Sequence, residues 1–226
     1  MILQIETATT SCSVALTQDG QVLAKKELNQ RNVHAEVLTL FIEGVFKHAD
    51  KQYADLDAIA VSSGPGSYTG LRIGVSTAKG LCYALDKPLI AVETLKAMAD
   101  GMISRLTLTP ESLLCPMIDA RRMEVFTAIF DINGNKITPT SAEIIDQSSF
   151  ADLLNDHKIY FFGDGAAKCR ETLTHPNAIF IDGYENSAND LTFAALKKFN
   201  SKDFEDVAYF EPYYLKEFIA GVKKIV

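Results

Sequence analysis

The sequence predicts an α/β protein of two lobes, each with a mixed β-sheet covered by helices. Two observations predict this class: strand-like and helix-like segments alternate along the chain, and one opening order occurs twice. In that order, two strands are followed by a tight turn of Asp-Gly or Asn-Gly type and then a third strand. The first copy has strands at 2–7, 13–17 and 22–28, and the second has strands at 113–119, 124–131 and 136–138.

Helices and further strands follow each copy. Strands are expected at 58–62, 89–92, 158–162 and 178–181. Helices are expected at about 33–48, at 67–85, from about 94, after the glycine loop of GDGAAKCRETL at 163–173, from about 187 and at about 215–226. A repeated unit of this kind is the plan of the actin-like, sugar-kinase and Hsp70 ATPase (ASKHA) fold. We expect an N-terminal lobe over 1–104 and a C-terminal lobe over 105–226, with the last helix packing back on one lobe.

Composition and charge disfavour several classes of protein. The net charge is −7, so a broad phosphate-binding surface is not expected, because affinity for nucleic acid depends on clustered lysine and arginine. If the protein acts on RNA, we expect another subunit to provide most of the RNA binding. No apolar run approaches the ~18 residues of a membrane span, and the N-terminus lacks the basic start of a signal peptide, so the expected location is cytoplasmic. Four scattered cysteines are expected to be buried thiols: Cys12, Cys82, Cys115 and Cys169.

The segment GPGSYTG at 64–70 lies where a nucleotide-binding loop would lie, between a strand and a helix. It lacks the Lys-Ser/Thr of a Walker loop and departs by one residue from G-x-G-x-x-G, so the motif disfavours a dinucleotide site. The helix that follows carries an apolar stripe beside a stripe of small residues, which lets another element approach closely. Two interpretations stay open: a tight fit onto the protein's own sheet, or contact with a partner helix.

The helix at 33–48 favours the second interpretation. Apolar residues surround more of it than one sheet face requires, so we expect an intersubunit helix contact. Gly74→Leu is then expected to break dimerisation and leave the monomer folded. The predicted interface residues are His34, Val37, Leu38, Phe41, Val45, Gly70, Leu71, Gly74, Val75, Ala78 and Cys82.

Catalytic motifs are not evident. The four histidines form neither H-E-x-x-H nor H-x-x-x-H, and the sequence has no G-x-S-x-G elbow. Asp119, Arg121 and Arg122 form a turn in DARRMEVF, where the arginines bind an anion or brace the hairpin. Tyr213 and Tyr214 in PYYLKEF are expected to anchor the core or to contact a partner.

Five segments resemble the TsaB (YeaZ) family of bacterial tRNA threonylcarbamoyladenosine biosynthesis: IETATTSCSVAL, SSGPGSYTGLRIGVSTAKGL, PLIAVETL, DARRMEVF and EPYYLK. The resemblance implies the ASKHA fold and a non-catalytic paralogue of TsaD. In TsaD a metal-binding H-x-x-x-H occupies the positions of Thr94 and Met98, so the metal site is expected to be lost here.

The resemblance also implies partners. The chain is expected to form a heterodimer with TsaD and a homodimer through the helices at 33–48 and 67–85. TsaE, an ATPase, docks on the pair, and TsaC supplies the threonylcarbamoyl adenylate. The complex modifies the adenosine next to the anticodon of tRNA, with this chain as scaffold and activator and with tRNA bound through the complex.

Two loops resemble the phosphate loops of the ASKHA fold. Their remnant residues are Thr9, Thr10, Ser11, Gly163 and Gly165. No cofactor of its own is expected, although weak or shared binding of ATP or ADP stays open. The alternatives are a metal-dependent peptidase-like protein and an ATP-dependent small-molecule kinase of the same fold.

Overall fold

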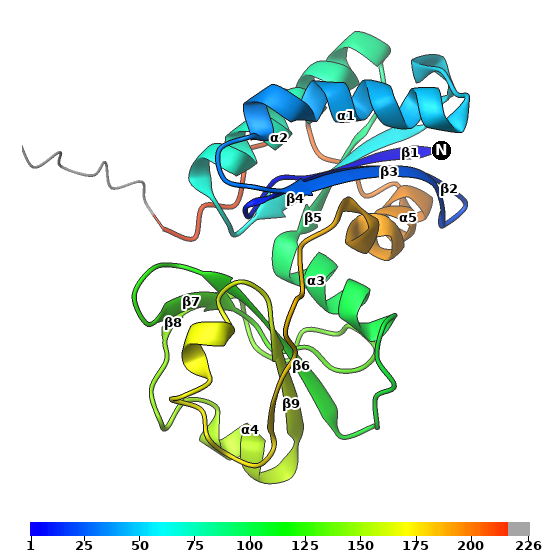
Figure 1. The fold of residues 1–226 in the computed structure, drawn as a ribbon. Coiled ribbons are helices and arrows are strands. Elements are labelled where there is room, and N and C mark those ends of the chain that lie inside the picture. Colours follow the sequence, from blue (N-terminus) through cyan, green and yellow to red (C-terminus); the bar gives the residue numbers. More distant parts are fainter. Residues whose placement is uncertain (217–226) are drawn as a thin grey trace, which may run out of the picture.

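A computed structural model describes residues 1–216 and contains two lobes stacked on each other, each built on a five-stranded sheet (Figure 1). The sheet of lobe I has the strand order β3-β2-β1-β4-β5, and that of lobe II has the order β10-β9-β6-β7-β8. In both sheets the first strand of the lobe pairs antiparallel with the second and parallel with a later strand. The predicted α/β class with a duplicated opening is confirmed.

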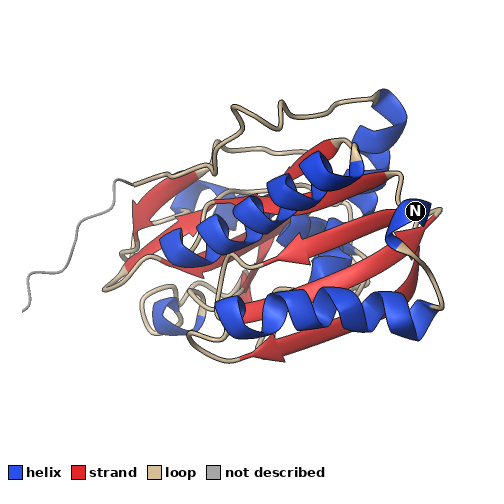
Figure 2. Cartoon of the chain, turned by 90° about the horizontal axis from the view of Figure 1, so that it is seen from above, coloured by secondary structure: helices blue, strands red, loops and turns tan. Residues whose placement is uncertain are grey.

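Lobe I takes its strands from the first 93 residues. They are β1 (Ile2–Glu6), β2 (Ser11–Gln18), β3 (Gln21–Asn29), β4 (Ala58–Gly64) and β5 (Leu89–Glu93). The predicted hairpin turn at Asp19 and Gly20 is present, and both residues have the positive φ that such a turn requires. Two helices, α1 (His34–Ala49) and α2 (Tyr68–Leu85), lie over the strands on one face (Figure 2). A short 3₁₀ turn, η1 (Tyr53–Asp55), precedes β4.

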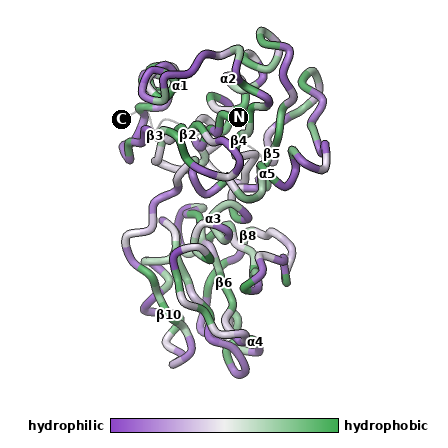
Figure 3. The backbone as a smooth tube through the Cα atoms, turned by 90° about the vertical axis from the view of Figure 1, so that its right-hand side faces the viewer, coloured by the Kyte–Doolittle hydropathy of each residue, from purple (hydrophilic) through white to green (hydrophobic). Residues whose placement is uncertain are grey.

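Lobe II has shorter elements. Its strands are β6 (Ser112–Asp119), β7 (Glu124–Thr127), β8 (Ser141–Ile144), β9 (Lys158–Phe162) and β10 (Ala178–Phe180), with helix α4 (Ala151–Asp156) and the 3₁₀ turn η2 (Ala167–Cys169). The hydrophobic residues follow the strands inside the lobe, as β6 illustrates (Figure 3). All four cysteines are buried free thiols, which confirms that prediction.

The lobe boundaries differ from those predicted at residue 104. The predicted boundary places helix α3 (Thr94–Ile103) in the first lobe, but Leu95 and Met98 pack in the core of lobe II, and Ala97 faces lobe I. Conversely, the prediction places η3 (Ala188–Leu191) and α5 (Thr192–Ser201) in the second lobe, but both cover the second face of the lobe I sheet. The reason is that this sheet is apolar on both faces, and a helix must remove the second face from water.

Other differences are local. The strand predicted at 136–138 is only an isolated bridge between Lys136 and Phe130, and the segment GDGAAKCRETL forms a single 3₁₀ turn rather than a longer helix. The helix predicted at about 215–226 lies outside the described residues from position 217 on.

A segment that we call the C-terminal strap, residues 202–216, returns along α2. Glu205 N donates to Leu89 O at 2.9 Å, and Lys79 Nζ donates to Phe210 O at 2.9 Å. Tyr213 N donates to Ser63 O at 2.7 Å, so the strap ends beside the loop that precedes α2. Among residues 1–216, no helix is both long and apolar enough to cross a membrane.

Candidate functional site

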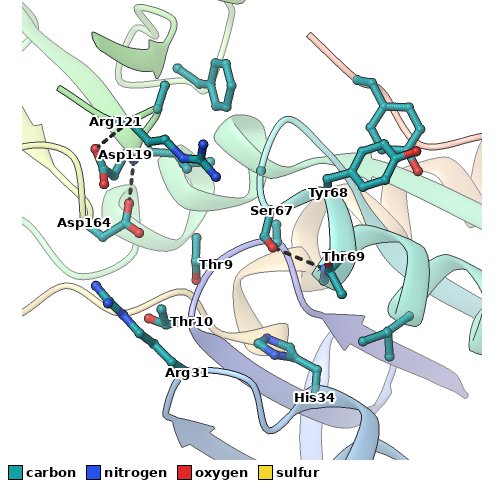
Figure 4. A pocket seen from close by; sticks show the side chains of 18 of the residues that line it. Thr9, Thr10, Arg31, His34, Ser67, Tyr68, Thr69, Asp119, Arg121 and Asp164 are labelled. Atoms are coloured by element: carbon teal, nitrogen blue, oxygen red, sulfur yellow. Dashed lines mark hydrogen bonds between the residues drawn. The ribbon is translucent and has the colours of Figure 1, made fainter. Parts of the chain in front are cut away.

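A cleft of about 710 Å³ lies between the lobes (Figure 4). Lobe I lines it with the β1–β2 loop, the start of α1 and the loop before α2, whereas lobe II lines it with the ends of β6 and β9. The strap closes one side through Tyr214, Leu215 and Lys216. The cleft therefore collects segments that are far apart in the sequence.

The β1–β2 loop is held by a buried carboxylate. Glu6 is 1% exposed and accepts a hydrogen bond from Ala8 N at 2.5 Å. Desolvation by burial raises the pKa of Glu6 to about 7. Of the predicted loop residues, Thr9 and Thr10 line the cleft, whereas Ser11 turns away and donates to Asn186 O at 2.6 Å.

The second predicted loop reaches the cleft through Asp164 alone. A Cβ on Gly163 would lie 2.7 Å from Met98 Cε, and one on Gly165 would lie 2.8 Å from Ile118 C. These two glycines therefore let the loop approach β6 and α3, and neither lines the cleft. Asp164 lies between them and accepts a hydrogen bond from Asp119 N at 2.9 Å.

The hairpin that carries Asp119 is braced by lysines. Lys168 forms an ion pair with Asp119, and Lys216 forms one with Glu124. The interpretation that the arginine side chains do the bracing is wrong, since Arg121 contributes only its backbone N–H to Asp119, at 3.1 Å. Within residues 1–216, neither Arg31 nor Arg121 forms an ion pair, and both line the cleft.

Aromatic side chains stand at the strap end of the cleft. The rings of Tyr68 and Tyr214 lie 4.8 Å apart between centroids, and Arg72 Nε donates to Tyr214 Oη at 3.3 Å. Tyr213 is 41% exposed, and only its backbone ties the strap down. Tyr68, Arg31 and Lys216 were missed in the sequence; the serine N-cap at Ser67, which accepts from Gly70 N, was the signal that places Tyr68 at a helix start.

The two positions compared with a metal-binding histidine pair lie in the first turns of α3. Thr94 is fully buried, and its Oγ1 accepts a hydrogen bond from Gly64 N at 3.1 Å. Met98 is 1% exposed and packs in the core of lobe II. In the described part of the chain, no three His, Cys, Asp or Glu side chains gather closely enough to hold a metal ion.

The predicted interface residues lie mostly inside lobe I. Only Val37 and Phe41 keep partial exposure, and the other nine are buried: His34, Leu38, Val45, Gly70, Leu71, Gly74, Val75, Ala78 and Cys82. The prediction that this stripe meets a partner helix is wrong, because the sheet of its own lobe covers it. Gly70 and Gly74 lie directly against Thr7, which favours the other interpretation of the glycines, the tight fit within the lobe.

Other residues form the solvent-facing sides of these helices. On α2 the small residues Ser76, Gly80 and Ala84 are exposed at a spacing of four, and a Cβ on Gly80 would meet nothing within 4 Å. On α1 the large residue Leu40 is 60% exposed. We call these four residues the outer face of α1 and α2. The spacing of four between Ser76, Gly80 and Ala84 was the sequence signal that could have identified the exposed side of α2.

The sequence of this chain is similar to those of known proteins. The family model of TsaD, tRNA N6-adenosine threonylcarbamoyltransferase, matches residues 21–220. The tRNA threonylcarbamoyladenosine biosynthesis protein TsaB of Escherichia coli is 38% identical, with 60% of this chain and 57% of that protein covered. TsaB of Bacillus subtilis is 34% identical, with 57% and 54% covered, so the chain matches a little over half the length of these relatives.

Solved structures share the fold. YeaZ from Pseudomonas aeruginosa superposes with a TM-score of 0.81 at 24% identity, covering 95% of this chain and 99% of that one. The activator of 2-hydroxyisocaproyl-CoA dehydratase from Clostridium difficile has a TM-score of 0.51 at 9% identity, covering 91% and 98%. The architecture is therefore the two-lobed ASKHA fold.

Proposed function

Because the chain belongs to the tRNA N6-adenosine threonylcarbamoyltransferase family, we propose that it acts in the biosynthesis of threonylcarbamoyladenosine in tRNA as a non-catalytic subunit. The similarity to TsaB proteins supports this role over that of the transferase itself. In the proposed complex the chain binds and activates TsaD, TsaE docks on the pair, and TsaC supplies the activated threonylcarbamoyl group. We propose that this complex modifies tRNA in the cytoplasm.

The observation that carries the proposal is the chemistry at Thr94 and Met98. A catalytic metal needs several imidazole, carboxylate or thiolate ligands around one open position. The hydroxyl of Thr94 instead accepts a hydrogen bond from Gly64 N, and Met98 packs in the core of lobe II beside Gly163. Helix α3 therefore serves packing between the lobes, where a transferase would need it to hold a metal.

The outer face of α1 and α2 is the proposed docking surface for TsaD and, in the absence of TsaD, for a second copy of the chain. Small residues on α2 let a partner helix approach closely, and Leu40 on α1 supplies an apolar side chain that a partner would bury. Val37 and Phe41 retain part of the predicted role at the side of α1.

We expect Leu40→Asp to weaken the complex with TsaD at least about tenfold, because a carboxylate buried at an apolar contact is left without a partner. Ile144→Asp is the matched control, since Ile144 is 73% exposed on β8 of the other lobe. The dissociation constants are measured by calorimetry with purified TsaD. Equal weakening by both variants, or by neither, would place the docking surface elsewhere.

The activity is tested by reconstitution. Purified chain, TsaD, TsaE and TsaC are incubated with tRNA, ATP, threonine and bicarbonate, and the nucleosides are measured by mass spectrometry. Modified adenosine is expected with all four proteins and not when this chain or TsaD is omitted. Modification by this chain and TsaC alone would contradict the non-catalytic role.

Two alternative functions have separate tests. A metal-dependent peptidase-like protein would retain zinc or iron through purification, which elemental analysis detects. A small-molecule kinase would bind ATP tightly in the cleft, whereas we propose no cofactor of its own and at most weak or shared binding of ATP or ADP. Calorimetric titration with ATP separates these two outcomes.

A further inference from the structure

The cleft between the lobes continues into a second hollow of about 330 Å³. The two hollows share four lining residues, Thr10, Arg31, Asp119 and Asp164. The first hollow reaches Tyr68 and Tyr214, and the second reaches Asn29 and Gln30 at the end of β3. We call the combined hollow the interlobe groove. Its extended form suits a segment of a chain better than a compact ligand.

The acidic residues of the groove are occupied by internal donors. Asp119 accepts from Lys168 Nζ and from Arg121 N, and Asp164 accepts from Asp119 N. Lys216 is likewise paired with Glu124. The Lys168–Asp119 and Lys216–Glu124 ion pairs neutralise much of their own charge at the lobe II side of the groove, whereas Asp164 receives a backbone N–H and has no ion-pair partner among the described residues.

Two arginines are left with unpaired charges in the groove. Arg31 comes from lobe I and Arg121 from lobe II, and among the described residues neither guanidinium has an ion-pair partner. Figure 4 shows the two side chains on different sides of the pocket, one on each lobe. Guanidinium groups bind phosphate oxygens through paired hydrogen bonds. The starts of α1 and α2 line the same space and add partial positive charge.

The strap end of the groove offers flat surfaces. Tyr68 and Tyr214 lie with their rings 4.8 Å apart, and Arg72 Cζ lies 4.3 Å from the centroid of Tyr68. Aromatic rings beside a basic groove are the usual platform for unpaired bases, because every base has a face that stacks. The groove thus combines sites for phosphate with a site for a base.

We propose that the interlobe groove binds an unpaired segment of RNA, with phosphates at Arg31 and Arg121 and a base against Tyr214. The identification of the ligand as RNA rests on the proposed function, since the groove itself specifies a phosphate-linked chain of aromatic groups. The net charge of −7 agrees with contact confined to one groove, because the remaining surface repels phosphate.

The phosphate contacts are tested with the full-length chain and a fluorescein-labelled anticodon stem-loop RNA, by anisotropy at about 50 mM salt. Arg121→Glu is compared with Arg122→Glu, because both arginines are exposed and have positive φ in one hairpin, and only Arg121 lines the groove. We expect about tenfold weaker binding for Arg121→Glu and less than about twofold for Arg122→Glu. Equal losses for the two variants, or no loss, would overturn the proposal.

The base contact is tested with Tyr214→Ala against Tyr209→Ala. Both tyrosines belong to the strap, and Tyr209 is 84% exposed outside the groove. We expect at least about fivefold weaker binding for Tyr214→Ala and little change for Tyr209→Ala. Tyr214→Phe keeps the ring and is expected to restore binding. Failure of that rescue would assign Tyr214 a structural role only and contradict the base contact.

Three further outcomes are distinguished. Displacement of the RNA by AMP at equal concentration would make the groove a mononucleotide site and overturn the proposal. If Arg121→Glu leaves RNA binding unchanged and instead weakens capture of TsaD, the groove is a protein interface and the proposal fails. Because binding is measured without TsaD, a negative reconstitution with intact RNA binding would reject the proposed function and leave the groove as an RNA site.

Discussion

Replacing Gly70 by alanine is expected to lower the free energy of unfolding by about 3 kcal/mol. The added Cβ would overlap Thr7 O, a backbone atom that follows β1 directly. This backbone cannot move aside, since β1 is the central strand of its sheet and is paired with β2 and β4. The helix would have to lift off the sheet, which would separate α2 from the core of lobe I.

Gly80→Ala is the matched control, because Gly80 lies on the same helix and its Cβ would meet nothing within 4 Å. Alanine is favoured over glycine in a helix, so this variant is expected to raise stability by about 0.5–1 kcal/mol. Urea unfolding followed by circular dichroism measures both changes. A loss for Gly80→Ala as large as that for Gly70→Ala would mean that glycine packing against Thr7 is not the cause.

The same geometry revises the expected effect of Gly74→Leu. The sequence predicts a folded monomer that no longer dimerises, but a Cβ at Gly74 would overlap the hydroxyl of Thr7. A leucine there has no space inside lobe I, so we now expect loss of folding rather than loss of a partner contact.

The second large effect concerns pH and Glu6. Burial raises the pKa of Glu6 from 4.5 to about 7 in the folded chain, so the folded state holds a proton that the unfolded chain has already released. The stabilisation from this proton is full below pH 4.5 and is lost as pH rises through 7. Over that interval the free energy of unfolding is expected to fall by about 3 kcal/mol on account of this group.

Glu6→Gln removes the titration and keeps an oxygen that can accept from Ala8 N. The free energy of unfolding of the variant, minus that of the wild type, is therefore expected to rise by about 3 kcal/mol as the pH is raised from 4.5 to just above 7. Urea unfolding at the two ends of this interval measures the difference. Glu36→Gln, on the exposed side of α1, is the control. An unchanged difference between the wild type and Glu6→Gln across the interval would contradict the assignment.

The architecture could be read from sequence because its signals are local. Alternating apolar segments, the Asp19-Gly20 turn and the helical spacing at 67–85 each depend on neighbours within a few residues. Thr9 and Thr10 were identified as remnants of a phosphate loop through the resemblance to the ASKHA fold, and the structure places both of them at the cleft.

The candidate site could be predicted less well from the sequence, because its contacts join segments that are distant along the chain. Arg31, Arg121 and Tyr214 come from three parts of the chain that only the stacking of the lobes brings to one groove. The glycine loop that follows β9 was similarly misleading, since Gly163 and Gly165 look the same in sequence whether they face a phosphate or a packed strand.

By itself, the sequence determined the alternation of strands and helices, the duplicated opening and the family resemblance, because periodicity and turn chemistry are properties of short segments. Only the tertiary structure decided which side of each helix faces water. An apolar stripe at Leu71 and Val75 has the same spacing whether it meets its own sheet or a partner. The distinction depends on what else in the fold covers that surface, and here lobe I covers it with its own strands.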